Sequence, residues 1–225
     1  MITALPYFVS NSLLEKAYNE VSMTDSRTVL NMPAGNFFYD PWKIKPEYKG
    51  TVCEKLLKSL PIVCGEARII ILNQRDCYSN HSDIDDRYHL TISSKCAYLI
   101  SLDTETMFES RTDGIWYEMD ASHKHTAINF GNRPRIQLVV RKLLNKSLRT
   151  DLISITIKTN LQDLEDARYE FDNRISSFLN KVNKENAMNN FAYKQDSVSL
   201  DIAPEYIDTL KKIAGVEFGV IIHDQ

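Results

Sequence analysis

The residue types most able to do chemistry gather between residues 81 and 135 of this 225-residue chain. His81 and Asp83 flank Ser82, and alternate residues of an extended segment point to the same side, so an imidazole and a carboxylate can reach one metal ion. His125 adds a second imidazole from a predicted strand farther along the chain. Two histidines and one carboxylate form a facial triad that leaves coordination positions of Fe(II) open. The spacing therefore predicts a metal centre formed by His81, Asp83 and His125.

Arg135 follows His125 by ten residues and opens an apolar run. If residues 130–134 form a turn, Asn129 pairs approximately with Arg135 across a hairpin, and His125 then lies about 13 Å along the strand at ~3.3 Å per residue. An arginine side chain and a five-carbon diacid chelated to the metal would together span this gap. The planar guanidinium suits the role because it binds a carboxylate through two parallel hydrogen bonds. We therefore expect Arg135 to bind an anionic ligand of the metal.

Further motifs surround these residues within about residues 66–145. The matching segments are His81-Ser82-Asp83, Arg87-Tyr88-His89-Leu90, Gly114-Ile115-Trp116, His125 to Asn129 and Arg135 to Val140. In this order they resemble the Fe(II)- and 2-oxoglutarate-dependent oxygenases, in particular the aspartyl/asparaginyl β-hydroxylase branch, which includes bacterial free-proline hydroxylases. HxD alone is a weak match, whereas HxD, then R-x-H, then a histidine ten residues before an arginine is a more specific series.

The resemblance implies a double-stranded β-helix, or jelly roll, in which His81, Asp83 and His125 hold Fe(II). It also implies a reaction in which O2 converts 2-oxoglutarate, the cosubstrate, into succinate and CO2. An amino-acid side chain would be hydroxylated at the same time, either Asp or Asn in a peptide or a free proline-like molecule. The family's cosubstrate-binding positions correspond here to Arg135 for the distal carboxylate, to Arg87 and His89 near the other end, and to Asn129.

The elements expected to position these residues are short strands. Apolar or alternating runs recur every ~8–12 residues between residues 66 and 145, which is typical of a sandwich or barrel. Strands are expected at 67–72, 87–92, 97–102, 107–111, 115–119, 126–129 and 135–140. The predicted fold class is therefore mainly β, with flanking N-terminal helices at 10–21 and 48–60 and a packed, proline-containing loop at 31–48.

The pattern changes after residue 150. Residues 1–150 carry 19 basic and 17 acidic side chains, whereas residues 151–225 carry 8 and 13. One helix is predicted over residues 161–182 from apolar positions three and four residues apart, interrupted only by Arg168. This stripe would pack in the core or against a second copy of the chain, which would make a homodimer. Strands at 152–159, 197–202 and 216–222, a loop at 183–190 and a helix at 204–214 complete the prediction.

This change predicts two domains: a jelly-roll oxygenase domain with N-terminal helices at 1–150, and a small α+β domain of unknown role at 151–225.

The balance of 27 Lys and Arg against 30 Asp and Glu lacks the basic excess that drives binding to nucleic acid. The sequence contains no run of 18 apolar residues, so no membrane-spanning helix is predicted. Scattered cysteines and a start unlike a signal peptide predict reduced thiols in the cytoplasm. The expected partner is a small-molecule or peptide substrate.

Other functions remain open at this point. A cupin-type metalloprotein that does not use 2-oxoglutarate commonly carries three histidines and a glutamate, and does not need Arg135. A non-catalytic jelly-roll binding module would hold the triad by accident, and residues 151–225 could be the working part instead. Arg135 favours the oxygenase. Of the neighbouring polar residues, His123 is expected at the surface, and Asp85 and Asp86 are expected to form a solvated acidic turn.

Overall fold

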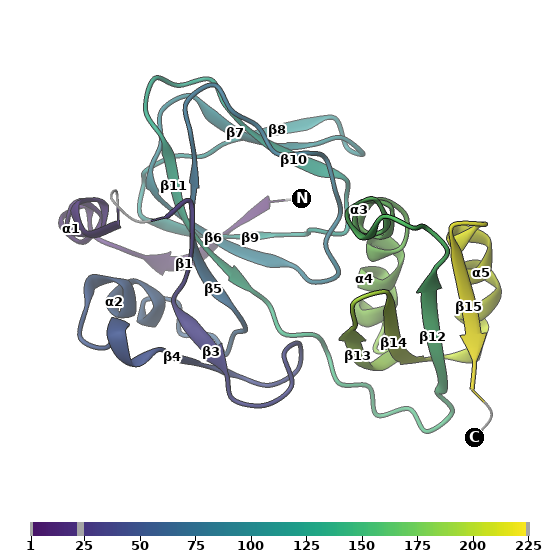
Figure 1. Ribbon diagram of the computed structural model, residues 1–225. Coiled ribbons are helices and arrows are strands. Elements are labelled where there is room, and N and C mark those ends of the chain that lie inside the picture. The colour runs from purple at the N-terminus through teal and green to yellow at the C-terminus, as the bar shows by residue number, and fades with distance from the viewer. Residues whose placement is uncertain (1, 22–24, 224–225) are drawn as a thin grey trace.

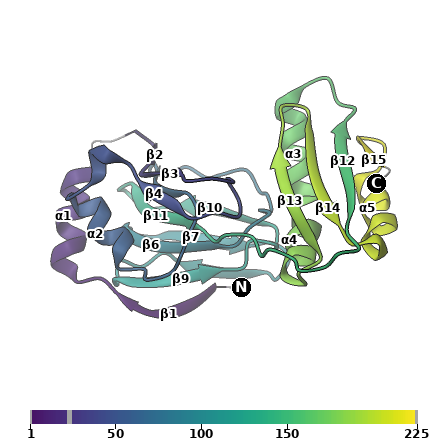
Figure 2. The ribbon, with the colours of Figure 1, turned by 90° about the horizontal axis from the view of Figure 1, so that it is seen from below.

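The computed structural model describes residues 2–21 and 25–223. It is mainly β, as the sequence predicts, with several antiparallel sheets. Two parts of unequal size lie side by side, joined by the extended segment that follows β11 (Arg135–Arg141) (Figures 1 and 2). In the described part of the chain, no helix combines the length and hydropathy needed to cross a membrane.

The larger part contains two sheets that face each other (Figure 1). The six-stranded sheet has the order β1-β9-β6-β11-β5-β2, and the three-stranded sheet has the order β10-β7-β8. The bounds in the large sheet are β1 (Ile2–Phe8), β2 (Arg27–Val29), β5 (Ala67–Leu72), β6 (Arg87–Ser93) and β9 (Ile115–Met119). Those in the small sheet are β7 (Ala97–Ser101), β8 (Thr106–Glu109) and β10 (His125–Asn129).

The segment between β5 and β6 runs along β10 and extends the small sheet. Isolated bridges pair Cys77 with Ile128 and His81 with His125, both antiparallel. Two backbone hydrogen bonds join the histidine pair, from His81 N to His125 O at 3.0 Å and from His125 N to His81 O at 2.9 Å. This pairing places the two histidines opposite each other although 44 positions separate them in the sequence.

The predicted hairpin between Asn129 and Arg135 is wrong. Asn129 pairs with Ala97 in the small sheet, whereas Arg135 pairs with Leu72 in the large sheet. The turn between them is therefore a corner that carries the chain from one sheet to the other. Alternation along a strand identifies its faces but not its partner strand, so the sequence pattern did not distinguish a corner from a hairpin.

Side-chain hydrogen bonds hold this corner in place. The Asn129 amide nitrogen donates to the backbone carbonyls of Leu72, Asn73 and Arg133 at 2.8–3.1 Å, and its oxygen accepts from the Gly131 amide at 2.9 Å. A Cβ at Gly131 would collide with the carbonyl oxygen of Lys95, so the close approach requires glycine. These contacts fix the distance between β10 and β11, and with it the position of Arg135 relative to His125.

The N-terminal helices α1 (Asn11–Val21) and α2 (Val52–Lys58) pack with the large sheet in one apolar core. Edge strand β1 was not predicted; it carries Pro6, and its register shifts between Ala4 and Phe8. Residues 31–48 are not simply a loop, because they contain the paired strands β3 (Asn31–Pro33) and β4 (Trp42–Ile44) and the 3-10 helix η1 (Pro46–Tyr48). These strands are three residues long, too short to show a period.

The smaller part is a sheet with the order β13-β14-β12-β15 covered by helices. Its strands are β12 (Ile153–Thr159), β13 (Met188–Tyr193), β14 (Ser197–Ile202) and β15 (Phe218–Ile222). Its helices are α3 (Leu164–Arg174), α4 (Ser176–Lys184), the 3-10 helix η2 (Pro204–Tyr206) and α5 (Ile207–Ala214). The α+β character agrees with the pattern in the sequence.

Two expectations for this part are wrong. The single helix predicted over 161–182 is two helices that break at Ile175, and the loop predicted at 183–190 contains the end of α4 and the start of β13. The break coincides with a hydrogen bond from the other part of the protein, because the Asp172 carbonyl accepts from the Ser82 amide at 3.1 Å. A contact between residues so far apart in the sequence leaves no mark on the local apolar period.

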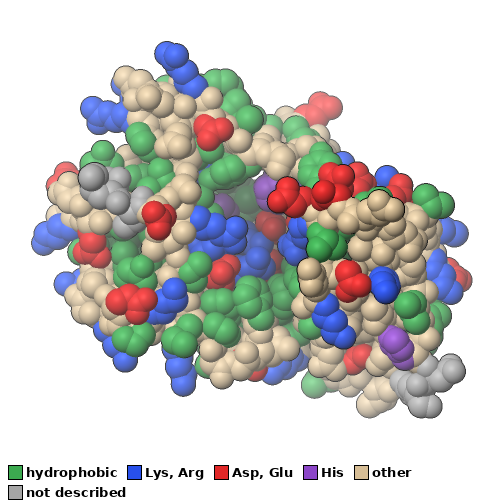
Figure 3. All heavy atoms as spheres, in the orientation of Figure 1, with side chains coloured by type: hydrophobic (Ala, Val, Ile, Leu, Met, Phe, Trp, Pro, Cys, Tyr) green, Lys and Arg blue, Asp and Glu red, His purple; other side chains and the backbone are tan. Residues whose placement is uncertain are grey.

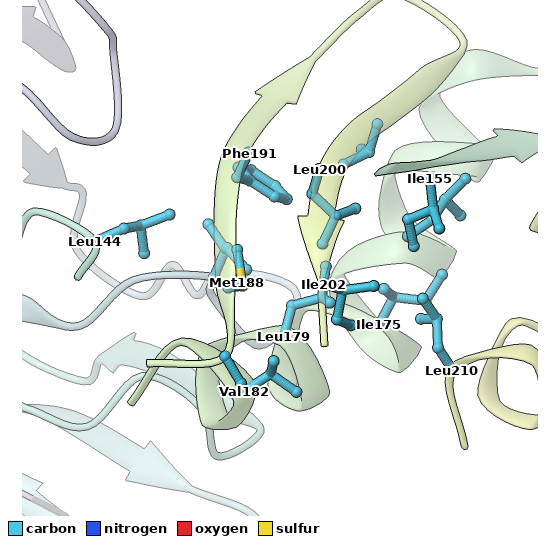
Figure 4. Packing of buried hydrophobic residues seen from close by; sticks show 14 of the residues in the cluster. Leu144, Ile155, Ile175, Leu179, Val182, Met188, Phe191, Leu200, Ile202 and Leu210 are labelled. Atoms are coloured by element: carbon cyan, nitrogen blue, oxygen red, sulfur yellow. The ribbon is translucent and has the colours of Figure 1, made fainter. Parts of the chain in front are cut away.

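The two parts share an apolar core. Leu144 from the connecting segment lies in the same cluster as Met188 and Phe191 of β13 (Figure 4). Phe38 and Ile84 from the larger part also belong to this cluster. The smaller part is therefore packed against the segment that follows His81, one of the predicted metal ligands.

Candidate metal centre

One ligand atom from each of His81, Asp83 and His125 lies within 4.8 Å of the other two. This is the one such group of three or more His, Cys, Asp or Glu side chains among the described residues. The backbone pairing of His81 with His125 sets the two imidazoles side by side, with 4.6 Å between ring centroids and 55° between the ring planes. Asp83 is held by a hydrogen bond from its amide to the Ala121 carbonyl at 2.9 Å. The structure thus brings the three predicted ligands together.

Both histidines are oriented with the same nitrogen toward the centre. His81 Nδ1 lies 2.9 Å from the Ser79 carbonyl oxygen, and His125 Nδ1 lies 2.8 Å from the His123 carbonyl oxygen. A carbonyl can only accept, so Nδ1 carries the proton in each ring and Nε2 keeps its lone pair. Such backbone contacts are the usual way in which proteins orient metal-binding imidazoles.

The two oxygens of the Asp83 carboxylate face different groups: one faces Arg87 and the other faces the two histidines. Oδ1 accepts from Arg87 at 2.8 Å, while Oδ2 lies 3.9 Å from His81 Nε2 and 3.7 Å from His125 Nε2. Burial by itself raises the pKa of Asp83, but the nearby Arg87, His81, His125 and Arg141, of which Arg87 has the largest effect, together hold the pKa well below its usual range. Asp83 is therefore an anion with one oxygen free to bind a metal.

The donor set fits a divalent transition metal. Two imidazole nitrogens and one carboxylate oxygen on one side of an ion leave its remaining positions facing the cavity, which is the facial arrangement associated with non-haem Fe(II). His123 does not join this set. Its ring faces Asp103 and Asp120 at 3.8 and 3.9 Å, away from Asp83.

We predict opposite outcomes for the two neighbouring histidines. His125→Ala should lose Fe(II) binding and activity because it removes an oriented ligand, whereas His123→Ala should keep both because its ring faces two partly exposed carboxylates. Anaerobic Fe(II) titration of both variants measures this difference. Loss of iron in the His123 variant alone would move the centre to that histidine.

A cavity of about 800 Å³ lies in front of the three residues. Both sheets contribute to its wall, and so does α3 of the smaller part. Figure 3 looks into this hollow, where blue Lys and Arg side chains and purple histidines lie deep between the two parts. The volume is within the range typical of small-molecule sites, about 300–1,000 Å³.

Arg135 is a buried cation without a protein anion. It is 2% exposed, lines the cavity, and has no carboxylate within ion-pair distance among the described residues. Its Nε and Nη1 atoms are buried without hydrogen-bond partners, and the ring of Tyr78 lies 5.9 Å from the guanidinium carbon. Burial lowers the pKa of Arg135. Because an isolated buried charge is costly, this arrangement indicates a site for an anionic ligand.

His89 supplies a neutral acceptor beside Arg135. Its Nδ1 lies 3.3 Å from Gln137 Oε1, and the Gln137 amide nitrogen donates to Thr91, which fixes the orientation of the amide. Its Nε2 is buried without a partner, and the residue lines the cavity. Burial, together with the nearby Arg135, lowers the pKa of His89 to about 3. His89 is therefore uncharged near neutral pH.

Two other predicted residues have structural partners of their own. Arg87 lines the cavity, but its guanidinium is held by the carboxylates of Asp83 and Asp85, so it orients a metal ligand rather than offering a free charge. Asn129 is buried and uses its side chain on the corner between β10 and β11. The Asn129 amide is thus already bonded to the backbone, and its role in binding the cosubstrate stays a prediction.

Asp85 and Asp86 are not a solvated acidic turn. Asp85 is 3% exposed and binds Arg141 through two hydrogen bonds of 2.8 and 2.9 Å in addition to Arg87. Asp86 is 8% exposed and accepts from the Ala121 amide and from Asn180. The partners lie far away in the sequence, so the local acidic run suggested exposure instead.

Asp85→Ala should lower the free energy of unfolding by about 3–5 kcal/mol, the usual cost of removing one partner from a buried ion pair. The change leaves Arg87 and Arg141 without their shared carboxylate. Urea denaturation monitored by circular dichroism measures the loss. Asp103→Ala, which removes a partly exposed carboxylate, is the matched control, and equal stability of the two variants would contradict the prediction.

Sequence reasoning missed several residues in the cavity wall: Arg68, Tyr78, Arg141, Arg168 and Asp172. Only Arg168 left a signal, as the polar interruption of an apolar helical stripe. No protein-family model and no curated protein matches this chain.

Proposed function

We propose that this chain is an Fe(II)- and 2-oxoglutarate-dependent oxygenase that hydroxylates an amino-acid side chain. The observation that carries the proposal is one cavity whose wall holds both the His81, Asp83 and His125 group and the unpaired Arg135. A metal centre and a buried cation in the same cavity suit a ligand that chelates through one end and carries a carboxylate at the other. 2-Oxoglutarate has this form.

The strand pairing supports a double-stranded β-helix as the finer description of the fold. Eight extended segments follow one another in chain order: β5, residues 77–81, β6, β7, β8, β9, β10 and β11. The first pairs with the eighth, the second with the seventh, the third with the sixth and the fourth with the fifth. A long hairpin that is folded over and rolled up produces this order, which is that of a jelly roll.

The residues fit the groups that the proposal requires. His81, Asp83 and His125 would hold Fe(II), and Arg135 would bind the distal carboxylate of 2-oxoglutarate through its unpartnered nitrogens. Bound iron would supply O2 activation coupled to oxidation of 2-oxoglutarate to succinate and CO2. His89 Nε2, a neutral acceptor in the same wall, can receive a hydrogen bond from a ligand or water.

The protein's own contribution is to orient these groups. Arg87 holds Asp83 as an anion with one oxygen free, and the Ser79 and His123 carbonyls keep each imidazole in the tautomer with Nε2 unprotonated. Arg135 lies on strand β11, directly after the corner that Asn129 holds in place. This fixed position limits where the far end of the ligand can lie. The donor set of two histidines and one aspartate, with His123 outside it, favours this function over a cupin with three histidines and a glutamate.

The experiment that tests the proposal is succinate release in the presence of Fe(II), O2, 2-oxoglutarate and pooled amino acids or peptides. Wild-type protein should form succinate, and the pool that contains the substrate should accelerate it. His81→Ala is the control because it removes one ligand from the surface of the cavity. Succinate formation that is unaffected by this change, or absent with every pool, would contradict the proposal.

A further inference from the structure

Helix α3 of the smaller part forms a wall of the metal-site cavity. Arg168 and Asp172 of this helix line the same cavity as His81, Asp83 and His125. The charge of Asp83 contributes to the electrostatic surroundings of both residues. The smaller part therefore supplies side chains to the cavity and not only apolar packing.

Hydrogen bonds fix α3 and α4 relative to the metal ligands. The Ser82 amide, between His81 and Asp83, donates to the Asp172 carbonyl at 3.1 Å. The buried amide of Asn180 donates to the Asp83 carbonyl at 3.1 Å. Lys184 adds contacts to Asp86 and Asp120 at 3.1 and 2.7 Å. Arg168 is thus held at a set position with respect to the centre.

Arg168 differs from three neighbouring arginines of the cavity. Arg87 and Arg141 are bound by Asp85, and Arg68 is buried beside Glu66 at 3.2 Å. Arg168 donates to Asp172 through Nε alone, at 2.9 Å, and its terminal nitrogens have no hydrogen bond among the described residues.

The guanidinium of Arg168 is also held against an aromatic ring. It lies over Tyr193, 4.0 Å from the ring centroid, with about half of its side chain exposed. Stacking on a ring fixes the plane of the guanidinium and leaves its outer edge open for a planar, bidentate acceptor.

We propose that Arg168 binds a carboxylate of the molecule that is hydroxylated, so that the smaller part selects the substrate. The inference rests on the proposed function, under which Arg135 is already occupied by the cosubstrate. Asp172, beside Arg168, disfavours a dianion such as a phosphate monoester and tolerates a single negative charge. The carboxylate can come from the α-carboxyl group of a free amino acid or from an acidic side chain in a peptide.

Binding of defined pools to protein loaded with Mn(II) and N-oxalylglycine, a non-reactive analogue of 2-oxoglutarate, tests the inference. One pool holds free amino acids with uncharged side chains, a second holds end-blocked peptides with Asp or Glu, and a third holds the carboxamide counterparts of both. Thermal shift is the readout. A carboxylate pool should raise the melting temperature, and the carboxamides should not.

Arg168→Gln should weaken that binding by at least about tenfold, since it truncates one partner of a charge pair. Arg174→Gln is the matched control, because Arg174 lies on the same helix, pairs with Glu170 four residues away, and is not among the residues that line the cavity. Arg168→Lys keeps the charge without the planar fork and should retain part of the binding.

The outcomes separate this inference from the proposed function. The pool that binds identifies the source of the carboxylate. Three results would overturn the inference: equal binding of the carboxamides, no binding of either carboxylate pool, or undiminished binding by Arg168→Gln. None of them contradicts the proposed function as long as the protein still binds Mn(II) and N-oxalylglycine. Wild-type protein that binds neither Mn(II) nor N-oxalylglycine would contradict the proposed function, and the inference with it.

Discussion

Asp83→Ala should abolish turnover and weaken Fe(II) binding by more than about a hundredfold. Changes to residues that only orient metal ligands typically cost 10–100-fold, so removal of a ligand itself should exceed this range. The fold should persist because Arg87, which loses one carboxylate, keeps Asp85. Anaerobic Fe(II) titration and succinate release measure the two effects.

Asp76→Asn is the matched control for that variant. Asp76 lines the same cavity but lies outside the group of three ligand residues. This change should leave iron affinity near the wild-type value. Near-normal turnover by Asp83→Ala would show that Asp83 is not a required ligand.

Arg135→Met should lower the affinity for 2-oxoglutarate by about 2–5 kcal/mol, the usual loss when one partner of a buried charge pair is truncated. The same change should leave the ligand-free protein as stable as wild type or more stable, because it replaces a buried cation that has no protein anion with an apolar side chain. Calorimetric titration with 2-oxoglutarate and urea denaturation of the ligand-free protein measure the two effects.

The opposite signs make this test specific. If Arg135 served only to stabilise the fold, its replacement would destabilise the ligand-free protein, as we expect for Asp85→Ala. Arg133→Ala changes an exposed residue in the adjoining turn and should alter neither quantity. Unchanged affinity for 2-oxoglutarate in Arg135→Met would remove Arg135 from the cosubstrate site.

The sequence was most informative where local geometry alone decides the outcome. Alternation in an extended segment placed His81 and Asp83 on one side, and the ten-residue offset from His125 placed Arg135 in the same cavity. The predicted hairpin between His125 and Arg135 was wrong, because a corner between sheets and a hairpin have the same local pattern. The roles of these residues in binding iron and 2-oxoglutarate stay predictions.

Long-range contacts account for most of what the sequence did not indicate. Asp85 is buried because Arg141, 56 positions away, returns to it on a neighbouring strand. The helical stripe breaks at Ile175, next to the Asp172 carbonyl that binds Ser82 from the other part of the protein. Arg168 looked like a defect of the stripe, whereas the structure places it at the wall of the cavity.

The most direct test of the central claim is anaerobic calorimetric titration of 2-oxoglutarate into the protein with and without Fe(II). The account predicts one Fe(II) per chain and binding of 2-oxoglutarate that requires the metal, because the cosubstrate would be held jointly by the metal centre and Arg135. Binding of 2-oxoglutarate with equal affinity in the absence of Fe(II), or no binding in its presence, would contradict the account.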